Sequence, residues 1–211
     1  MKIAILKERR PHEKRVAATP ETVKKLGALG ADVVIEAGAG TAAAYTDQAY
    51  EAAGAKIARN ASEACSAAEI VFKVQRPMAA DEGNDELGLL RQGQTLMAPL
   101  GALTNKPLVQ ALAGKGVQAF ALELIPRITR AQSMDILSSQ ANLAGYKAVL
   151  VAANTFGRIF PQMMTPGGTL VPSRAFIMGV GVAGLQAIAT ARRLGAVVTA
   201  TDVRPATKEQ V

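Results

Sequence analysis

Residues 174–202 read RAFIMGVGVAGLQAIATARRLGAVVTATD, and this stretch decides the fold of the region around it. The apolar residues 175–178 predict a strand, and a glycine-rich turn follows at residues 179–184. Residues 185–194 have the composition of a helix, and Gly195 stands where a left-handed residue commonly ends one. The stretch therefore begins as strand, turn and helix.

The glycines of this turn are spaced as G-x-G-x-x-G, at Gly179, Gly181 and Gly184. The first allows the tight turn, the second lets a pyrophosphate approach the backbone, and the third lets the helix pack close on the strand. The helix N-terminus then offers unpaired N–H groups and the positive end of its dipole to phosphates. This order of elements is the one that a dinucleotide-binding motif requires. The alternative is a unit whose glycines serve packing only.

Asp202 follows a second predicted strand, residues 196–201, and lies 18 residues after Gly184. Its carboxylate can accept hydrogen bonds from both hydroxyls of an adenosine ribose. A 2′-phosphate would meet like charge there, so the sequence favours NAD(H) over NADP(H). Arg204 lies close enough to soften this preference but not to reverse it.

The composition is that of a globular protein with one large or two small domains in 211 residues. Aromatic residues make up only 4% and Trp is absent, so Ala, Val, Leu and Ile must build the core. The single cysteine, Cys65, excludes an internal disulfide and indicates a reducing compartment. We interpret it as a structural thiol, and the only histidine, His12 in a polar loop, is not taken as a catalytic base.

Neither a membrane span nor a nucleic-acid site is predicted. The longest uncharged apolar run, residues 175–185, is far shorter than the ~20 residues that a bilayer requires. The first strand is too short to be a signal peptide, so we expect a soluble, cytoplasmic protein. Residues 1–30 hold eight Lys and Arg against three Glu, but no aromatic residues interleave with them. We predict no nucleic-acid partner and no metal site.

Strands alternate with helices through the N-terminal half of the chain, which predicts a mostly parallel sheet covered on both faces. Thr19 and Pro20 mark one helix start, as N-cap and first helical residue. We expect strands at residues 2–6, 32–36, 70–74, 95–98 and 117–122, and helices at residues 20–29, 47–53, 62–67 and 106–114.

The C-terminal half begins after the sequence PRITR at residues 126–130, which we interpret as a hinge. A long helix is predicted from Ser133 to Phe160, then a loop to Pro172. The fold prediction is α/β, with two Rossmann-like domains built on parallel sheets. The second is incomplete, because such a domain needs about six strands. We therefore expect a piece of a longer protein. The predicted divisions are an N-terminal α/β domain at residues 1–130, a linking helix and loop at 131–165, and the start of an NAD-binding Rossmann domain at 166–211.

A second group of polar residues precedes the glycine turn: Arg127, Gln132, Asp135 and Ser138. Gln132, Asp135 and either Ser138 or Ser139 are spaced by three to four, which places them on one face at the start of the predicted helix. Together they can match the donor and the acceptor of a carboxamide, such as that of nicotinamide. The alternative is an N-terminal capping cluster on a solvated helix.

These motifs carry a family resemblance. The stretches RITRAQSMDILSSQ at residues 127–140 and GVGVAGLQA at 179–187, with KERR at 7–10 and KVQRP at 73–77, closely resemble the NAD(H)-binding component of proton-translocating nicotinamide nucleotide transhydrogenase. The resemblance covers essentially the whole chain. It implies a homodimer on the inner face of a bacterial inner membrane, held there by an NADP(H)-binding component and a membrane component. Hydride would pass directly between NAD(H) here and NADP(H) on the partner, coupled to proton translocation.

The resemblance also implies which residues act. It places Arg127, Gln132 and Asp135 in a catalytic role beside the nicotinamide. It implies that the cofactor contacts are Arg127, Ile128, Thr129, Gln132, Ser133, Asp135, Ser138, Gly179, Val180, Gly181, Val182, Gly184, Asp202, Val203 and Arg204.

Two other functions remain as alternatives. Alanine dehydrogenase shares this architecture, and the Arg and Lys that hold its substrate carboxylate correspond to Arg15 and Lys73. Its catalytic His corresponds to Gly101, however, and glycine cannot shuttle the proton that amino-acid oxidation needs. Hydride exchange between two nicotinamides needs no such group, so Gly101 favours the transhydrogenase. The other alternative is a non-catalytic NAD-binding protein.

Overall fold

The computed structural model describes residues 1–211, apart from the side chain of Gln210, and divides into two compact units. Unit 1 comprises residues 1–126 and unit 2 comprises residues 127–211. Each unit carries its own parallel sheet and is described by itself.

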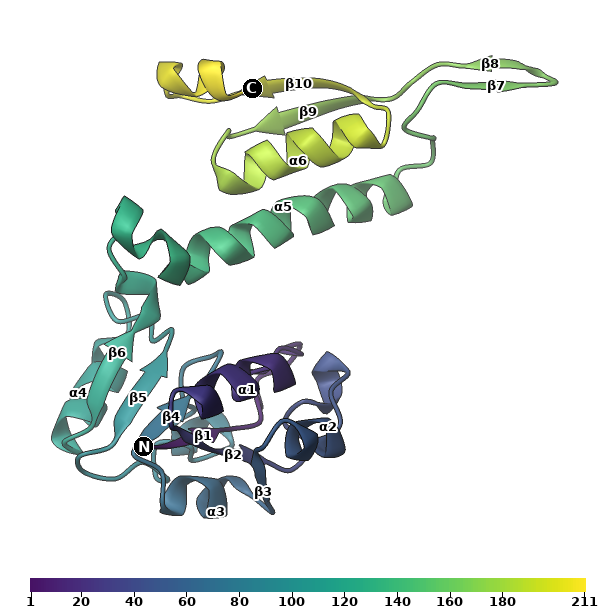
Figure 1. The fold of residues 1–211 in the computed structure, drawn as a ribbon. Helices are drawn as coiled ribbons and strands as arrows, with labels where there is room; N and C mark the ends of the chain where they lie inside the picture. The colour runs from purple at the N-terminus through teal and green to yellow at the C-terminus, as the bar shows by residue number, and fades with distance from the viewer. The chain divides into compact units, whose positions relative to one another are not determined.

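Unit 1 is a six-stranded parallel sheet with helices between its strands (Figure 1). Its strands are β1 (Lys2–Ile5), β2 (Asp32–Glu36), β3 (Lys56–Ala58), β4 (Ile70–Phe72), β5 (Thr95–Ala98) and β6 (Gln118–Ala121). Its helices are α1 (Pro20–Ala28), α2 (Asp47–Ala52), α3 (Ala61–Ser66) and α4 (Lys106–Gly114). The prediction of an α/β fold with a parallel sheet is confirmed, although the short strand β3 was not predicted.

The central strand β1 is buried on both faces, as expected for a parallel sheet. Ile3 and Ile5 pack into the hydrophobic cluster on one face, while Ala4 and Leu6 pack into the cluster on the other. The predicted start of α1 is also confirmed. Thr19 is the N-cap and accepts a hydrogen bond from the N–H of Thr22 at 3.2 Å, and Pro20 is the first helical residue.

The strand order of unit 1 is β3-β2-β1-β4-β5-β6. The chain therefore winds outward in one direction from β1 and in the other from β4. In open α/β sheets a crevice forms at such a switch point, beside the carboxyl ends of the strands. The segments that follow β1 and β4 begin at Leu6 and Lys73, and they hold most of the buried charges of unit 1.

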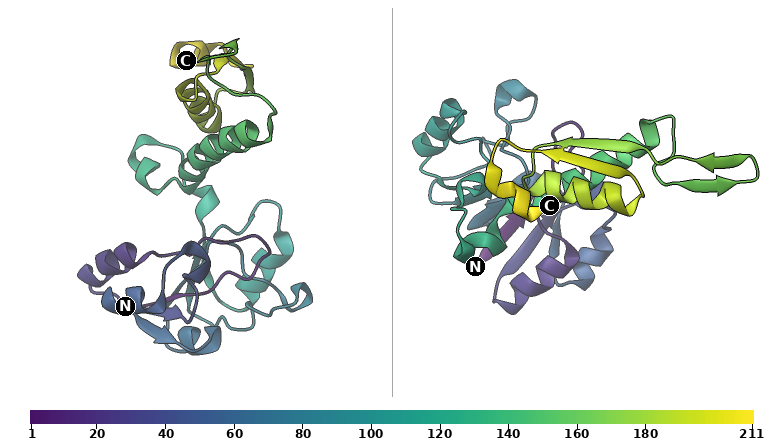
Figure 2. Two further views of the ribbon diagram at one scale, coloured as in Figure 1. Left: turned by 90° about the vertical axis from the view of Figure 1, so that its right-hand side faces the viewer. Right: turned by 90° about the horizontal axis from the view of Figure 1, so that it is seen from above.

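Unit 2 is built from one long helix and a strand–helix–strand unit. It contains α5 (Ile136–Thr155), β7 (Met163–Thr165), β8 (Gly168–Leu170), β9 (Arg174–Met178), α6 (Val182–Arg193) and β10 (Val197–Thr201). Strands β9 and β10 are parallel, and α6 lies between them and α5 (Figures 1 and 2). The unit that the glycine motif predicts is confirmed.

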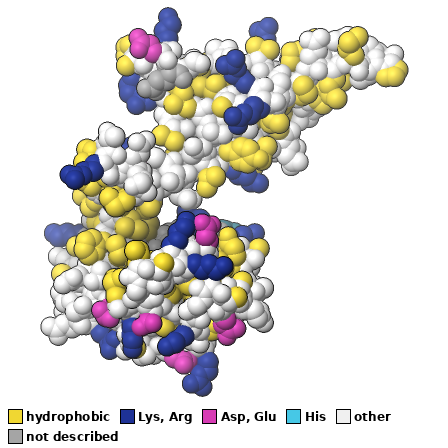
Figure 3. All heavy atoms as spheres, viewed as in Figure 1, with side chains coloured by type: hydrophobic (Ala, Val, Ile, Leu, Met, Phe, Trp, Pro, Cys, Tyr) yellow, Lys and Arg dark blue, Asp and Glu magenta, His cyan; other side chains and the backbone are white. Residues whose placement is uncertain are grey.

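Two predictions for unit 2 are corrected. Helix α5 is shorter than the predicted 133–160, because Asp135 serves as its N-cap and Phe156 is already extended. The predicted loop before β9 contains the antiparallel hairpin β7–β8, closed by a hydrogen bond from the Thr165 hydroxyl to the carbonyl of Gly168 at 2.9 Å. Its side chains are exposed, and Figure 3 shows hydrophobic ones along it.

Helices α5 and α6 pack tightly against each other. At Gly145 of α5 the space for a side chain is taken by the backbone of Ala183 in the first turn of α6. Among the described residues, no helix is long and apolar enough to cross a membrane.

Candidate functional site

Each glycine of the turn between β9 and α6 has its own physical reason. Gly179 has a φ of 94°, in the left-handed region that favours glycine. A Cβ on Gly184 would collide with the carbonyl oxygen of Gly179, so packing requires this glycine. A Cβ on Gly181 would meet no atom of the described residues within 4 Å. The packing of the chain therefore explains Gly184 and leaves Gly181 open to the approach of a ligand.

The first turn of α6 offers N–H donors to such a ligand. Gly181 is the N-cap and has no side chain with which to accept a hydrogen bond from that turn. The first helical bond runs from the N–H of Leu185 to the carbonyl of Gly181 at 2.8 Å. The N–H groups before Leu185 therefore point out of the helix, where the positive end of its dipole favours an anion. This geometry suits a pyrophosphate.

The carboxylate of Asp202 lies beside the glycine turn, as its position at the end of β10 predicts. Its Oδ2 accepts a hydrogen bond of 2.7 Å from the N–H of Val180. Arg204 donates to the same carboxylate three times, from its backbone N–H at 2.8 Å and from Nε and Nη2 at 3.0 Å each. These hydrogen bonds, led by that of the Arg204 side chain, hold the pKa of Asp202 well below its usual range. Asp202 is therefore ionised at neutral pH.

The structure brings together only part of the second predicted group, the polar residues near the start of α5. The Asp135 carboxylate caps α5 by accepting from the N–H of Ser138 at 2.9 Å, and it also accepts from the Ser138 hydroxyl at 2.6 Å. Arg127 closes the cluster, donating to the Ser138 hydroxyl at 3.0 Å and to Asp135 at 3.4 Å. The Ser138 hydroxyl is the main cause that lowers the pKa of Asp135. Asp135 is thus the N-cap of α5, and the N–H of Ser138 is its capping partner.

The prediction that Gln132 shares a helix face with Asp135 and Ser138 is wrong. Gln132 and Ser133 lie in a 3₁₀ turn, Thr129–Met134, which precedes α5, and both are exposed. Ile128 and Val203 are exposed as well, at 58% and 97%. An exposed position leaves these residues free to meet a ligand, but the chain itself does not orient them.

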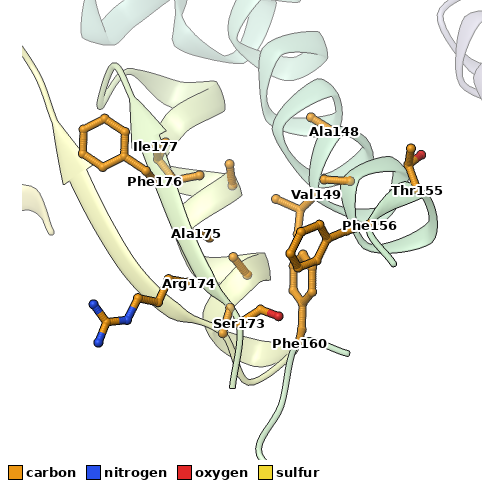
Figure 4. A pocket seen from close by; sticks show the side chains of 14 residues that line it. Ala148, Val149, Thr155, Phe156, Phe160, Ser173, Arg174, Ala175, Phe176 and Ile177 are labelled. Carbon is orange, nitrogen blue, oxygen red and sulfur yellow. The ribbon is translucent and has the colours of Figure 1, made fainter. Parts of the chain in front are cut away.

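A cavity of unit 2 lies away from the glycine turn, between α5, α6 and β9 (Figure 4). It has a volume of about 580 Å³ and is lined mainly by apolar side chains, among them Val149, Phe156 and Phe160. Arg174 and Phe176 point away from it on the other side of β9. A site without converging polar groups does not suit a pyrophosphate or a ribose.

Unit 1 holds a buried ion cluster that the sequence analysis missed. The Lys73 ammonium lies 2.8 Å from Glu86 and 3.3 Å from Oε2 of Glu8, and all three side chains are at most 3% exposed. Arg9 joins Glu86 to Glu36. Oε2 of Glu8 has no hydrogen-bond donor within the described part of the chain, and burial raises the pKa of this carboxyl. Lys73 directly follows the apolar strand β4, and this was the sequence signal that the lysine is buried.

Arg15 and Lys73, which the resemblance to alanine dehydrogenase led us to consider as carboxylate-binding cations, are both paired with carboxylates of this chain. Arg15 donates to both oxygens of Glu13, at 2.8 and 2.6 Å, and these bonds lower the pKa of Glu13 to about 2. Gly101 has a φ of 62°, in the left-handed region that favours glycine. Cys65 is buried and its pKa is raised by burial to about 11, which fits a structural thiol.

Comparison with known proteins agrees with these features. Residues 4–144 match the family model described as alanine dehydrogenase/PNT, N-terminal domain, and residues 148–211 match the corresponding C-terminal domain. The whole chain is 44% identical to 39% of NAD(P) transhydrogenase subunit alpha of Cereibacter sphaeroides, and 42% identical to 40% of the same subunit of Haemophilus influenzae. Over 96% of the chain, it is 34% identical to 53% of alanine dehydrogenase of Halomonas elongata. The chain thus spans about half the length, or less, of these curated relatives.

A solved structure supports the same grouping. The crystal structure of transhydrogenase from Sinorhizobium meliloti superposes on the whole chain with a TM-score of 0.94 and 54% sequence identity, and 61% of that chain is covered. The match extends through both units and includes the glycine turn. The chain therefore belongs to the alanine dehydrogenase/PNT family.

Proposed function

We propose that this chain is a segment of the NAD(H)-binding component of a proton-translocating transhydrogenase. Hydride passes directly between NAD(H) bound here and NADP(H) bound on a partner component, and this exchange is coupled to proton translocation. The component acts as a homodimer and reaches the membrane through its partners. The observation that carries the choice of reaction is Gly101, which the family resemblance aligns with the catalytic histidine of alanine dehydrogenase.

The residues of unit 2 fit a dinucleotide. The open space at Gly181 and the free donors of the first turn of α6 would hold the pyrophosphate. Asp202, ionised and anchored by Val180, would accept from the adenosine ribose and repel a 2′-phosphate. Ile128, Thr129, Ser133 and Val203 would line the nucleotide. NAD(H), when bound, supplies or accepts the hydride.

The cluster at the start of α5 would orient the nicotinamide. Arg127 and Ser138 hold the Asp135 carboxylate in place, and the exposed Gln132 can add an amide donor and acceptor. Gly145, where α6 begins to pack, comes ten residues after Asp135, which corresponds to roughly 15 Å of helix. A nucleotide that reaches both groups must therefore be extended. In a direct hydride transfer, positioning the reactants is the main catalytic contribution of the protein.

The alanine dehydrogenase alternative has less support. Oxidation of an amino acid needs a group that takes a proton, and Gly101 cannot do so. Lys73 is enclosed by Glu8 and Glu86, and Arg15 is bound to Glu13, so an incoming carboxylate would have to displace carboxylates of the chain itself. An experiment separates the two reactions. The full-length protein should bind NADH more tightly than NADPH and should not oxidise NADH when pyruvate and ammonium are supplied.

A further inference from the structure

Every acceptor position of the Asp202 carboxylate is already filled. A carboxylate offers about four lone-pair positions, two on each oxygen. Oδ2 accepts from the Val180 N–H and from Nη2 of Arg204, and Oδ1 accepts from the Arg204 N–H and from its Nε. In this conformation Asp202 has no position left for a ribose hydroxyl.

The four donors fall into two pairs with different properties. The N–H groups of Val180 and Arg204 belong to the backbone, one on each oxygen, and they hold the carboxylate where it is. The other two come from the guanidinium of Arg204, again one on each oxygen. A ribose presents two neighbouring hydroxyls, which would also reach one oxygen each. The guanidinium thus fills the two positions that a cis-diol needs.

We propose that the Arg204 guanidinium is an internal competitor for the ribose diol and thereby sets the cofactor preference of this site. Binding of the diol displaces the guanidinium from Asp202, while the two backbone donors remain. This inference rests on the proposed function, because it takes NAD(H) as the ligand. It goes further in giving Arg204 a role in the free protein as well as in the complex.

The exposures of the two side chains allow this exchange. The Asp202 side chain is 6% exposed, so the acceptor is fixed, whereas the Arg204 side chain is 60% exposed and can swing into water. Exposed ion pairs contribute little free energy, so displacement lowers the affinity of a diol only by about twofold to fivefold. Once displaced, the guanidinium stays near the 2′ position, where it attracts a 2′-phosphate. Arg204 therefore weakens NADH binding and strengthens NADPH binding.

The test compares ligands with and without the diol on two variants of the full-length protein. Arg204→Ala removes the competitor, and Arg192→Ala removes an equal charge from the last turn of α6 as the control. Dissociation constants are measured for NADH, NADPH, ADP and 2′,3′-dideoxy-ADP. Circular dichroism shows whether each variant is folded.

We expect Arg204→Ala to bind NADH and ADP about twofold to fivefold more tightly and NADPH about twofold to fivefold more weakly. The affinity for 2′,3′-dideoxy-ADP should not change, and Arg192→Ala should behave as the wild type. Weaker NADH binding by Arg204→Ala, or an equal change for ADP and its dideoxy form, would overturn the inference. Failure of the wild type to bind NADH at all would instead refute the proposed function.

Discussion

Gly145 of α5 lies so close to Ala183 of α6 that a Cβ on the glycine would collide with the carbonyl oxygen of Ala183. Ala183 belongs to the first turn of α6, whose N–H groups are the proposed pyrophosphate donors. The close approach of two helices therefore positions one side of the nucleotide site.

Replacing Gly145 tests whether the close approach of α5 and α6 positions the nucleotide site. Gly145→Ala should lower the free energy of unfolding by about 1–3 kcal/mol through overpacking, and it should weaken NADH binding because Ala183 has to move. Gly157→Ala is the control in the same unit, since a Cβ there meets no atom within 4 Å. Urea unfolding and NADH titration measure both effects. If the two variants had the same stability and the same NADH affinity, the close approach at Gly145 would not position the nucleotide site.

Asp202→Ala should weaken NADH binding about tenfold to hundredfold, because the ribose hydroxyls lose their charged acceptor. The N–H of Val180 loses its partner as well. NADPH binding should suffer less, because the charge that repels its 2′-phosphate is also removed. Isothermal titration of both nucleotides checks this expectation. An unchanged NADH affinity would mean that Asp202 does not hold the ribose.

The two proposed roles of Asp135 can be separated by one substitution. Asp135→Asn keeps a residue that caps helices well but removes the charge that Arg127 meets. If Asp135 orients the nicotinamide, hydride exchange should slow by about 100-fold with little loss of NADH affinity. Gln132→Ala, outside the helix, should slow exchange without any loss of stability. If both variants exchanged hydride at the wild-type rate, the cluster at the start of α5 would serve only to cap the helix.

The pH dependence of stability tests the ion cluster of unit 1. Burial raises the pKa of Glu8 above its ordinary value of 4.5, so the folded state retains a proton that the unfolded state has already released. The stability that this proton contributes is present below pH 4.5 and is lost as the pH rises towards the raised pKa. Glu8→Gln should therefore stabilise the protein at pH 7. It should also reduce the change in the free energy of unfolding with pH.

Glu21 provides the control for that experiment, because Lys25 lowers its pKa by a hydrogen bond. Its contribution has the opposite sign: it is present above the ordinary pKa and is lost as the pH falls. Glu21→Gln should slightly destabilise the protein at pH 7. Thermal unfolding between pH 4 and 8 measures both variants, and a destabilised Glu8→Gln at pH 7 would contradict the account.

The local signals in the sequence predicted much of this fold. The glycine spacing predicted β9, α6 and β10, and Thr19 with Pro20 predicted the start of α1, because a few neighbouring residues determine each feature. The start of α5 was missed because both Ser133 and Asp135 are good N-caps, and the choice depends on the contacts of Arg127 and Ser138.

Other features could not be predicted because they depend on tertiary structure. Glu8, Lys73 and Glu86 are distant in the chain and meet only because β1 and β4 are neighbours in the sheet. The pairing of Arg204 with Asp202 depends on side-chain conformation, which the spacing of two residues does not specify. The sequence shows these charged residues, but it does not predict which of them pair with one another.

The proposed reaction is direct hydride transfer from NADH on this component to NADP⁺ on a partner. The most direct test mixes the full-length protein with its NADP(H)-binding component and supplies NADH that carries deuterium at C4, using each of the two stereoisomers in turn. Mass spectrometry then follows the label. The account predicts that one stereoisomer transfers its deuterium to NADP⁺, so that the NADPH formed carries the label without loss to solvent. Loss of the label to water, or oxidation of NADH only when pyruvate and ammonium are present, would contradict it.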